Sequence, residues 1–154
     1  MRLSPAFVIT ATLGPMQDLG PTTRGHRRII PITGGTFNGT MPDGTPLRGN
    51  VLPGGADWQI VRPDGVAEVE ARYTLQTDDG TLILITNRGY RHGPAEVLKR
   101  VADGEWVDPA EYYFRTTPMF EVAPGPHDWL GRTVFVATGE RRADEVIIRV
   151  FAVE

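Results

Sequence analysis

The chain of 154 residues contains no cysteine. Disulfide bonds, thiolate nucleophiles and thiolate metal sites are therefore excluded, and the absence fits a reducing compartment. Histidine is scarce as well, and the three residues present are not spaced as metal ligands. We therefore expect neither a metal nor a cofactor.

Long apolar runs and an excess of basic charge are also missing. No segment approaches the roughly 18 apolar residues of a membrane span, and the short apolar run near the start, interrupted by Pro5, does not have the length of a signal peptide. The formal net charge of −3 argues against nucleic acid, because phosphate binding needs a concentrated basic face. We expect a cytoplasmic protein that binds neither membranes nor nucleic acid.

Common enzyme motifs are absent too. The sequence has no GxSxG elbow, no HExxH and no Gly-rich loop ahead of a helix. The segment "GGTFNG" (34–39) contains glycines, but no helix pattern follows it that would offer amide dipoles to a phosphate. We interpret it as a loop between strands, so no motif names a reaction.

Turn signals, in contrast, are abundant. Asp-Gly pairs recur among 18 glycines and 13 prolines, and both residues tolerate the positive φ of hairpin turns. The runs between the turns are rich in β-branched and aromatic residues, which predicts one all-β domain over 1–154, a single antiparallel barrel or sandwich. One short helix is expected within 93–104, where proline, acid, base and glycine follow in helix order. The expected strands cover 5–13, 27–33, 57–62, 66–77, 81–87, 111–121, 132–139 and 145–153.

The pattern inside the strands favours a barrel with a covered outer wall. Residues 69–77 alternate between apolar and polar side chains, whereas "TLILIT" (81–86) and "RTVFVAT" (132–138) are apolar on both sides. A strand with two apolar faces must be covered on both. In a closed barrel the outer face then needs a partner, and we expect a homodimer.

Several charged or aromatic residues stand among apolar ones and are candidates for a site. Asp57 either caps a turn or lines a cavity, and Trp58 beside it is expected in the core or the cavity wall. Arg115 shares a strand face with Tyr113 and must reach water, a carboxylate or a ligand, because an unpaired buried charge is costly. Trp129 is either a lid over the barrel mouth or a plug for the core.

Arg72 raises the same question in "EARYTLQTDDG" (70–80). It lies between Ala71 and Tyr73 on the polar side of its strand, with Glu70. That side is either a wet outer face or a polar row that points into a cavity. Together with Arg115, an inward Arg72 would provide paired donors for a carboxylate or enolate, whereas an outward one belongs to a structural ion-pair network.

Five motifs follow one another from about residue 24 to the C-terminus: "RGHRRIIPITGGTFNGT", "GNVLPGGADW", "EARYTLQTDDGTLI", "YYFRTTPMFE" and "DWLGRTVFVATGERR". Their order resembles that of the DUF3237 family. The resemblance implies a lipocalin-like antiparallel β-barrel and leaves the activity unassigned. Three positions depart from the family pattern: Glu70 replaces an aspartate, Gln76 a frequent arginine and Gly131 a frequent asparagine.

Two functions follow from these observations. In the first, the protein is a cofactor-independent enzyme that transfers a proton on a small, oxygenated, partly apolar molecule in the barrel mouth, as an isomerase, lyase or hydrolase. The second is a binding protein for a hydrophobic or aromatic carboxylate, without chemistry. For the enzyme, the candidate residues are Asp57 or Glu70 for the proton, Arg72 and Arg115 for the oxyanion, and Trp58, Tyr113 and Trp129 for the wall.

Overall fold

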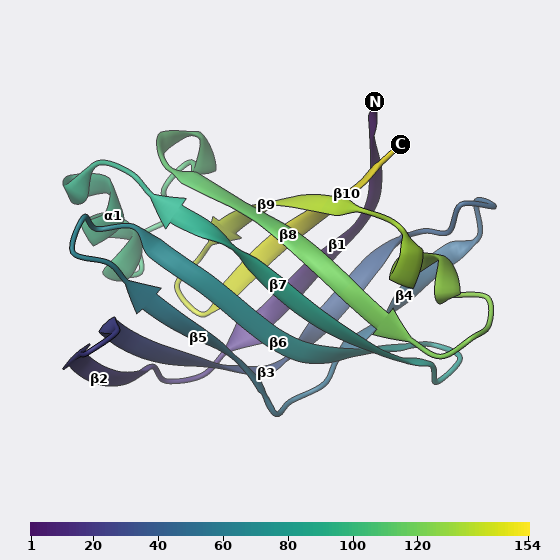
Figure 1. The fold of residues 1–154 in the computed structure, drawn as a ribbon, viewed down its shortest axis with the longest axis horizontal. Helices are drawn as coiled ribbons and strands as arrows, with labels where there is room; N and C mark the ends of the chain where they lie inside the picture. Colours follow the sequence, from purple (N-terminus) through teal and green to yellow (C-terminus); the bar gives the residue numbers. More distant parts are fainter.

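Ten strands form one antiparallel sheet that closes on itself, because β1 pairs with both β10 and β3. The computed structural model describes all residues 1–154, and Figure 1 shows the resulting closed barrel. The strands are β1 (Leu3–Leu13), β2 (Gln17–Thr22), β3 (Gly25–Thr40), β4 (Pro46–Val51), β5 (Gly55–Val61), β6 (Ala67–Thr77), β7 (Leu82–His92), β8 (Tyr113–Val122), β9 (Phe135–Arg141) and β10 (Glu145–Val153). The helix is α1 (Ala95–Ala102), with 3-10 turns η1 (Pro109–Glu111) and η2 (Asp128–Arg132).

Most strands pair with their neighbours in the chain, as expected when tight turns connect them. The order around the sheet runs β1, β10, β9, β8, β7, β6 and back to β3, with β4 and β5 both pairing with β3 and β6. Strand β2 pairs only with β3 and extends beyond the barrel. The predicted antiparallel barrel is therefore confirmed, including its single helix.

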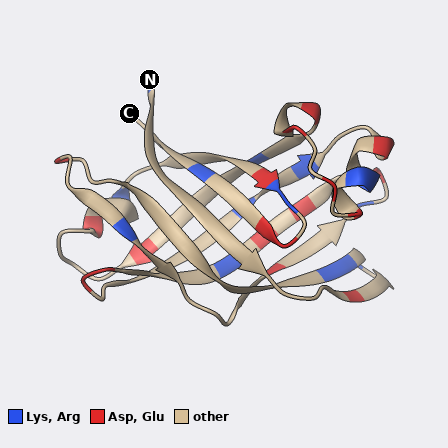
Figure 2. Ribbon diagram, turned by 180° about the vertical axis from the view of Figure 1, so that it is seen from behind, with Lys and Arg blue, Asp and Glu red and all other residues tan.

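Side chains alternate along each strand between the inside and the outside of the barrel, and the apolar ones that point inward form the core. In β6 the side chains of Val69, Ala71, Tyr73 and Leu75 are buried, as predicted, and those between them are more exposed. Figure 2 shows acidic and basic residues interspersed along the strands. No helix of the structure combines the length and the apolar character that a bilayer crossing requires.

Aromatic rings fill the end of the barrel beside η2. The ring of Phe120 lies 5.5 Å from that of Phe7 and 5.1 Å from that of Phe135, centroid to centroid. Trp129, in η2, adds a fourth ring 5.7 Å from Phe135. Such tilted and edge-on contacts stabilise a core beyond simple burial. The two chambers described below lie toward the opposite end of the barrel, where α1 lies (Figure 1).

Two features of the fold differ from the sequence prediction. The segment 34–39 is not a loop but part of the long strand β3, which pairs there with β1. Glycine is required at this point, because a Cβ on Gly35 would lie 2.0 Å from the carbonyl oxygen of Thr10. The strands β2 and β4 were not predicted, since glycine and proline interrupt both and few of their residues are buried.

Candidate functional site

Two adjacent cavities occupy the α1 end of the barrel. The outer chamber, of about 200 Å³, lies beneath α1 and is lined by Arg28, Ala67, Leu98 and Val101 among others. The inner chamber, of about 40 Å³, lies deeper and is lined by Asp57, Tyr73, Asn87 and Phe114 among others. Ile30, Arg91 and Arg141 line both chambers. The two chambers therefore form one small pocket in the barrel lumen. Arg91 and Arg141 line the place where the chambers meet, which we call the waist.

Asp57 points into the inner chamber because its cross-strand partners, Ile30 and Ala71, are buried on the same face. Its Oδ1 accepts the backbone N–H of Glu70 at 2.9 Å, and its Oδ2 accepts Nε2 of Gln59 at 3.1 Å. Burial raises the pKa of the Asp57 carboxyl, although these hydrogen bonds and the charge of Arg91 oppose the shift. The result is a fixed carboxyl group that holds its proton more tightly than an exposed aspartate does.

Three arginines surround this carboxyl without forming an ion pair with any acid. Arg28 comes from β3, Arg91 from β7 and Arg141 from β9, whereas every ion pair of the molecule involves other basic residues. Arg28 donates to the side chain of Gln59, which links it to Asp57. Arg141 donates to the carbonyl oxygens of Ala143 and Glu145, both at 3.3 Å.

Arg91 is the least satisfied of the three. Its guanidinium lies over the ring of Phe114, with Cζ 5.5 Å from the ring centroid, and it donates no hydrogen bond to the protein. Burial, reinforced by the charge of Arg28, lowers the pKa of Arg91 to about 10, and burial also lowers the pKa of Arg28 and of Arg141. Three guanidinium groups around one carboxyl give the lumen an excess of positive charge.

Other polar atoms of the barrel interior are also without partners. The Oδ1 of Asn87, the Oγ1 of Thr116 and the Nε of Arg28 are buried and make no hydrogen bond. Buried polar groups are nearly always satisfied, so a cluster of exceptions requires an explanation. No group of three or more His, Asp or Glu side chains is arranged to hold a metal ion.

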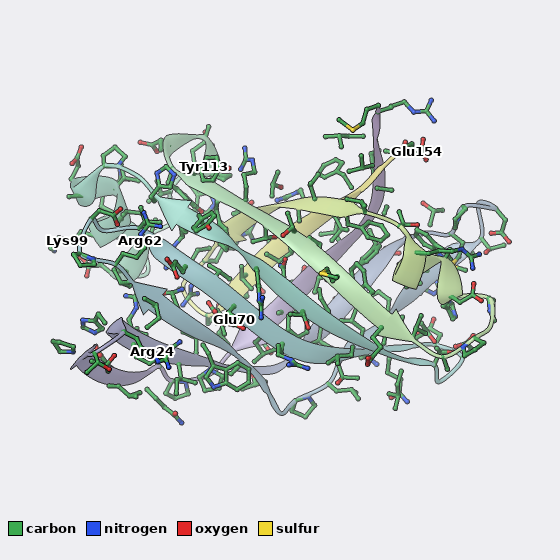
Figure 3. All side chains as sticks on the ribbon, viewed as in Figure 1. Arg24, Arg62, Glu70, Lys99, Tyr113 and Glu154 are labelled. Atoms are coloured by element: carbon green, nitrogen blue, oxygen red, sulfur yellow. The ribbon has the colours of Figure 1, made fainter.

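The predicted site residues do not all meet in the lumen. Asp57 is there, but Glu70 and Arg72 face outward, because they alternate with the buried Ala71 and Tyr73. Glu70 pairs with Arg88 at 2.8 Å on the outer wall, and Figure 3 shows Glu70 on β6 on the near side of the barrel. Trp58 also lies outside, with 38% of its surface exposed, because only Asp57 and Gln59 of its strand point inward there.

The remaining three candidates are likewise separated from the chambers. Tyr113 and Arg115 are exposed on β8, with the Arg115 guanidinium 5.6 Å from the Tyr113 ring. Phe114 between them is the residue that faces inward. Trp129 packs in the filled end of the barrel, away from α1, so it plugs the core and does not cover the mouth.

A larger hollow, of about 520 Å³, lies on the outer wall and contains Trp58 and Glu70 with Arg27 and Arg88. Most of its charged groups have partners, because Glu70 pairs with Arg88 and Arg27 donates to the carbonyl oxygen of Trp58 at 2.8 Å. Arg24, which has none, is exposed to solvent. The lumen, by contrast, combines unpaired charge with burial. We therefore take the lumen as the candidate site.

Arg28, Arg91, Arg141 and Asn87 were not identified from the sequence. Arg28 belongs to the basic cluster "RGHRR" (24–28), and such a cluster in a sequence usually indicates a solvated loop or strand end. The sequence did contain a signal for two of them, the alternation of side chains along a strand. Arg91 and Asn87 are an even number of residues away from the buried Ile83 and Ile85, so all four side chains point to the same face of β7.

The fold and the site together define a small antiparallel β-barrel with a basic, partly apolar lumen. Residues 1–153 match the family described as "Protein of unknown function (DUF3237)", and the chain belongs to this family. A UPF0311 protein of Rhodopseudomonas palustris is 45% identical over 147 residues, which cover 96% of this chain and 93% of the relative. The predicted family resemblance is thus confirmed.

Solved structures show the same architecture. The crystal structure of the Rhodopseudomonas palustris protein superposes with a TM-score of 0.90 at 43% identity, covering 99% of this chain and 97% of the other. A β-barrel-like protein of Acinetobacter baumannii gives 0.84 at 44% identity, covering 99% and 96%. A protein from Penicillium herquei, described as an enzyme, shares the fold alone, with a TM-score of 0.66 at 19% identity over 97% and 93% of the chains.

Proposed function

We propose that the protein is a cofactor-independent enzyme that transfers a proton on a small, partly apolar, oxygenated molecule bound in the lumen. The observation that carries the proposal is the position of Asp57, a partly buried carboxyl of raised pKa that faces a cavity. General acid–base catalysis works best when the pKa of the catalytic group lies near the operating pH. Burial moves an aspartate in that direction.

The arginines provide the second half of the chemistry. Asp57, as a carboxylate, removes a proton from a carbon next to a carbonyl group. The C–H electron pair then forms a C=C bond, and the carbonyl π pair moves onto oxygen, where Arg91 stabilises the negative charge. Return of the proton from Asp57 to a different atom of the same molecule completes an isomerisation, which consumes no other reactant.

The second candidate function is a binding protein for a hydrophobic or aromatic carboxylate. The observation that favours it is the excess of arginine, since Arg28, Arg91 and Arg141 line the outer chamber without an acidic partner. Such a protein needs the guanidinium groups and the apolar wall, but does not need Asp57 to be ionised. The two functions therefore differ in the consequence of replacing Asp57.

Exchange of solvent deuterium into small enolisable oxo acids, with phenylpyruvate as the first, distinguishes them. We expect the protein to accelerate exchange above the buffer rate, and Asp57→Asn to slow this catalysed exchange by about 10²-fold or more. The outward-facing Arg72→Ala and Arg115→Ala are matched controls for Arg91→Ala, and only the last should reduce the rate. Binding without catalysed exchange would favour the binding protein, and full activity in Asp57→Asn would disprove the role of Asp57.

A further inference from the structure

The dimensions of the two chambers limit the size of the ligand. The outer chamber, of about 200 Å³, has apolar walls from Ile30, Ala67, Leu98 and Val101. An apolar cavity of about 150 Å³ is large enough for benzene, so this chamber accommodates a single ring. The inner chamber, of about 40 Å³, is much smaller than the outer one. It accommodates a small polar substituent of the ligand but not a ring.

The waist between the chambers is built for an anion. Arg91 and Arg141 line both chambers, and the guanidinium of Arg91 has no hydrogen-bond partner in the protein. Guanidinium groups match a carboxylate in both charge and geometry. A ligand whose ring occupies the outer chamber therefore places its carboxylate at this waist.

The inner chamber requires a hydrogen-bond donor from the ligand. Asp57, Ala71 and Asn87 lie side by side across β5, β6 and β7, and the small side chain of Ala71 leaves space between the two polar ones. Asn87 is 2% exposed, and its Oδ1 is buried without a partner. A buried acceptor without a donor is costly, so a ligand hydroxyl that donates to Oδ1 gains affinity.

We infer that the ligand is a single-ring acid with a hydroxyl or enol group on the carbon next to its carboxylate. The ring lies beneath α1, the carboxylate meets Arg91 and Arg141, and the hydroxyl enters the inner chamber and donates to Asn87. This assignment rests on the lumen being the site of the proposed function, and it names the substrate class.

Calorimetric titration with matched probes tests the assignment. Mandelate carries the hydroxyl, phenylacetate lacks it, and 2-methoxy-2-phenylacetate keeps the oxygen but cannot donate. We expect mandelate to bind about tenfold more tightly than either of the others, the value of roughly one hydrogen bond. Mandelamide, which has no charge, should bind at least tenfold more weakly than mandelate.

Variants locate the preference at Asn87. Asn87→Leu should reduce the difference between mandelate and phenylacetate to within about twofold, whereas Asn38→Leu, at an exposed position of β3, should leave it unchanged. Asn87→Asp keeps the acceptor and should keep the preference for the hydroxyl. The wild-type probe series decides the question even if Asn87→Leu does not fold.

Three results would overturn the assignment: no binding of mandelate at 10 mM, equal affinity for mandelate and phenylacetate, or a preference that survives in folded Asn87→Leu. A protein that shows the expected preference but catalyses no deuterium exchange would refute the proposed enzyme and leave the ligand assignment standing. A protein that catalyses exchange but does not prefer the hydroxyl would support the proposed enzyme and refute the ligand assignment.

Discussion

At the scale of single residues, parity along a strand decides which charges enter the barrel. Arg72 and Arg91 both belong to strands with regular alternation, but Arg72 stands between the buried Ala71 and Tyr73 and faces solvent. Arg91 shares its face with Ile85 and enters the lumen. A shift of one position along a strand thus decides whether an arginine faces solvent or the lumen. In the lumen, burial lowers the pKa of Arg91 to about 10.

Asp57 leads to a prediction about stability and pH. Burial raises its pKa in the folded state, whereas an unfolded aspartate titrates near about 3.9. The folded state therefore holds this proton more tightly, so the stabilisation from Asp57 is complete below about pH 4 and is lost as the pH rises toward the folded pKa. Asp57→Asn removes this loss. The free energy of unfolding of Asp57→Asn minus that of the wild type should therefore increase as the pH rises from about 4 toward the folded pKa of Asp57.

Urea unfolding in steps from about pH 3.5 to 8 measures this difference. Asp144→Asn, at an exposed turn position, is a control that should show no such increase. A difference between Asp57→Asn and the wild type that stays constant with pH, or that decreases as the pH rises, would contradict the burial of an otherwise unpaired carboxyl.

At the scale of elements, close contact between β7 and β8 positions the site. These strands pair from Ile83 with Val122 to His92 with Tyr113, and Gly89 stands between the two lumen residues Asn87 and Arg91. A Cβ on Gly89 would lie 2.1 Å from the carbonyl oxygen of Arg115. Absence of a side chain at this point therefore sets the separation of two strands that carry the site.

Gly89→Ala should accordingly destabilise the protein by about 2–4 kcal/mol, because the added methyl group pushes β8 away from β7. Gly131→Ala is the matched control, since the nearest atom to its new Cβ is the carbonyl oxygen of Phe120 at 3.8 Å, and its effect should stay within about 0.5 kcal/mol. Urea unfolding at pH 7 compares the two. Equal effects would show that the β7–β8 contact is more tolerant than its geometry indicates.

At the scale of the whole molecule, part of the outer wall is apolar. Pro5, Phe151 and Val136 lie side by side across β1, β10 and β9, and Val134 beside them is 68% exposed. Contiguous exposed apolar surface of this kind is typical of contacts between subunits. The expected homodimer thus has a candidate face on the wall formed by these three strands.

Light scattering at micromolar concentration should give twice the chain mass of 16.9 kDa. Val136→Glu places a charge in the apolar row and should yield the monomer mass, whereas Leu82→Glu, at an exposed apolar position of β7, should leave the dimer intact. A monomer mass for the wild type would refute the dimer, and dissociation by both variants would refute this choice of face.

The sequence by itself determined the barrel, most of its strands, its helix and its family, because turn chemistry and side-chain alternation are local properties that a single segment displays. It also indicated Asp57 as a candidate, from its place after a glycine pair. The strands β2 and β4 escaped prediction, since their pairing with β3 overrides the glycine and proline within them.

Only the tertiary structure decided which residues share the lumen. Asp57, Ala71 and Asn87 become neighbours through the register of three strands, and Arg28, Arg91 and Arg141 meet because closure of the sheet brings β3, β7 and β9 around one cavity. Register and closure depend on pairing between distant segments, and a one-residue shift would turn every side chain of a strand to the other face. For that reason the local patterns left open whether Arg72 faces a cavity or solvent, and the closed sheet turned it outward.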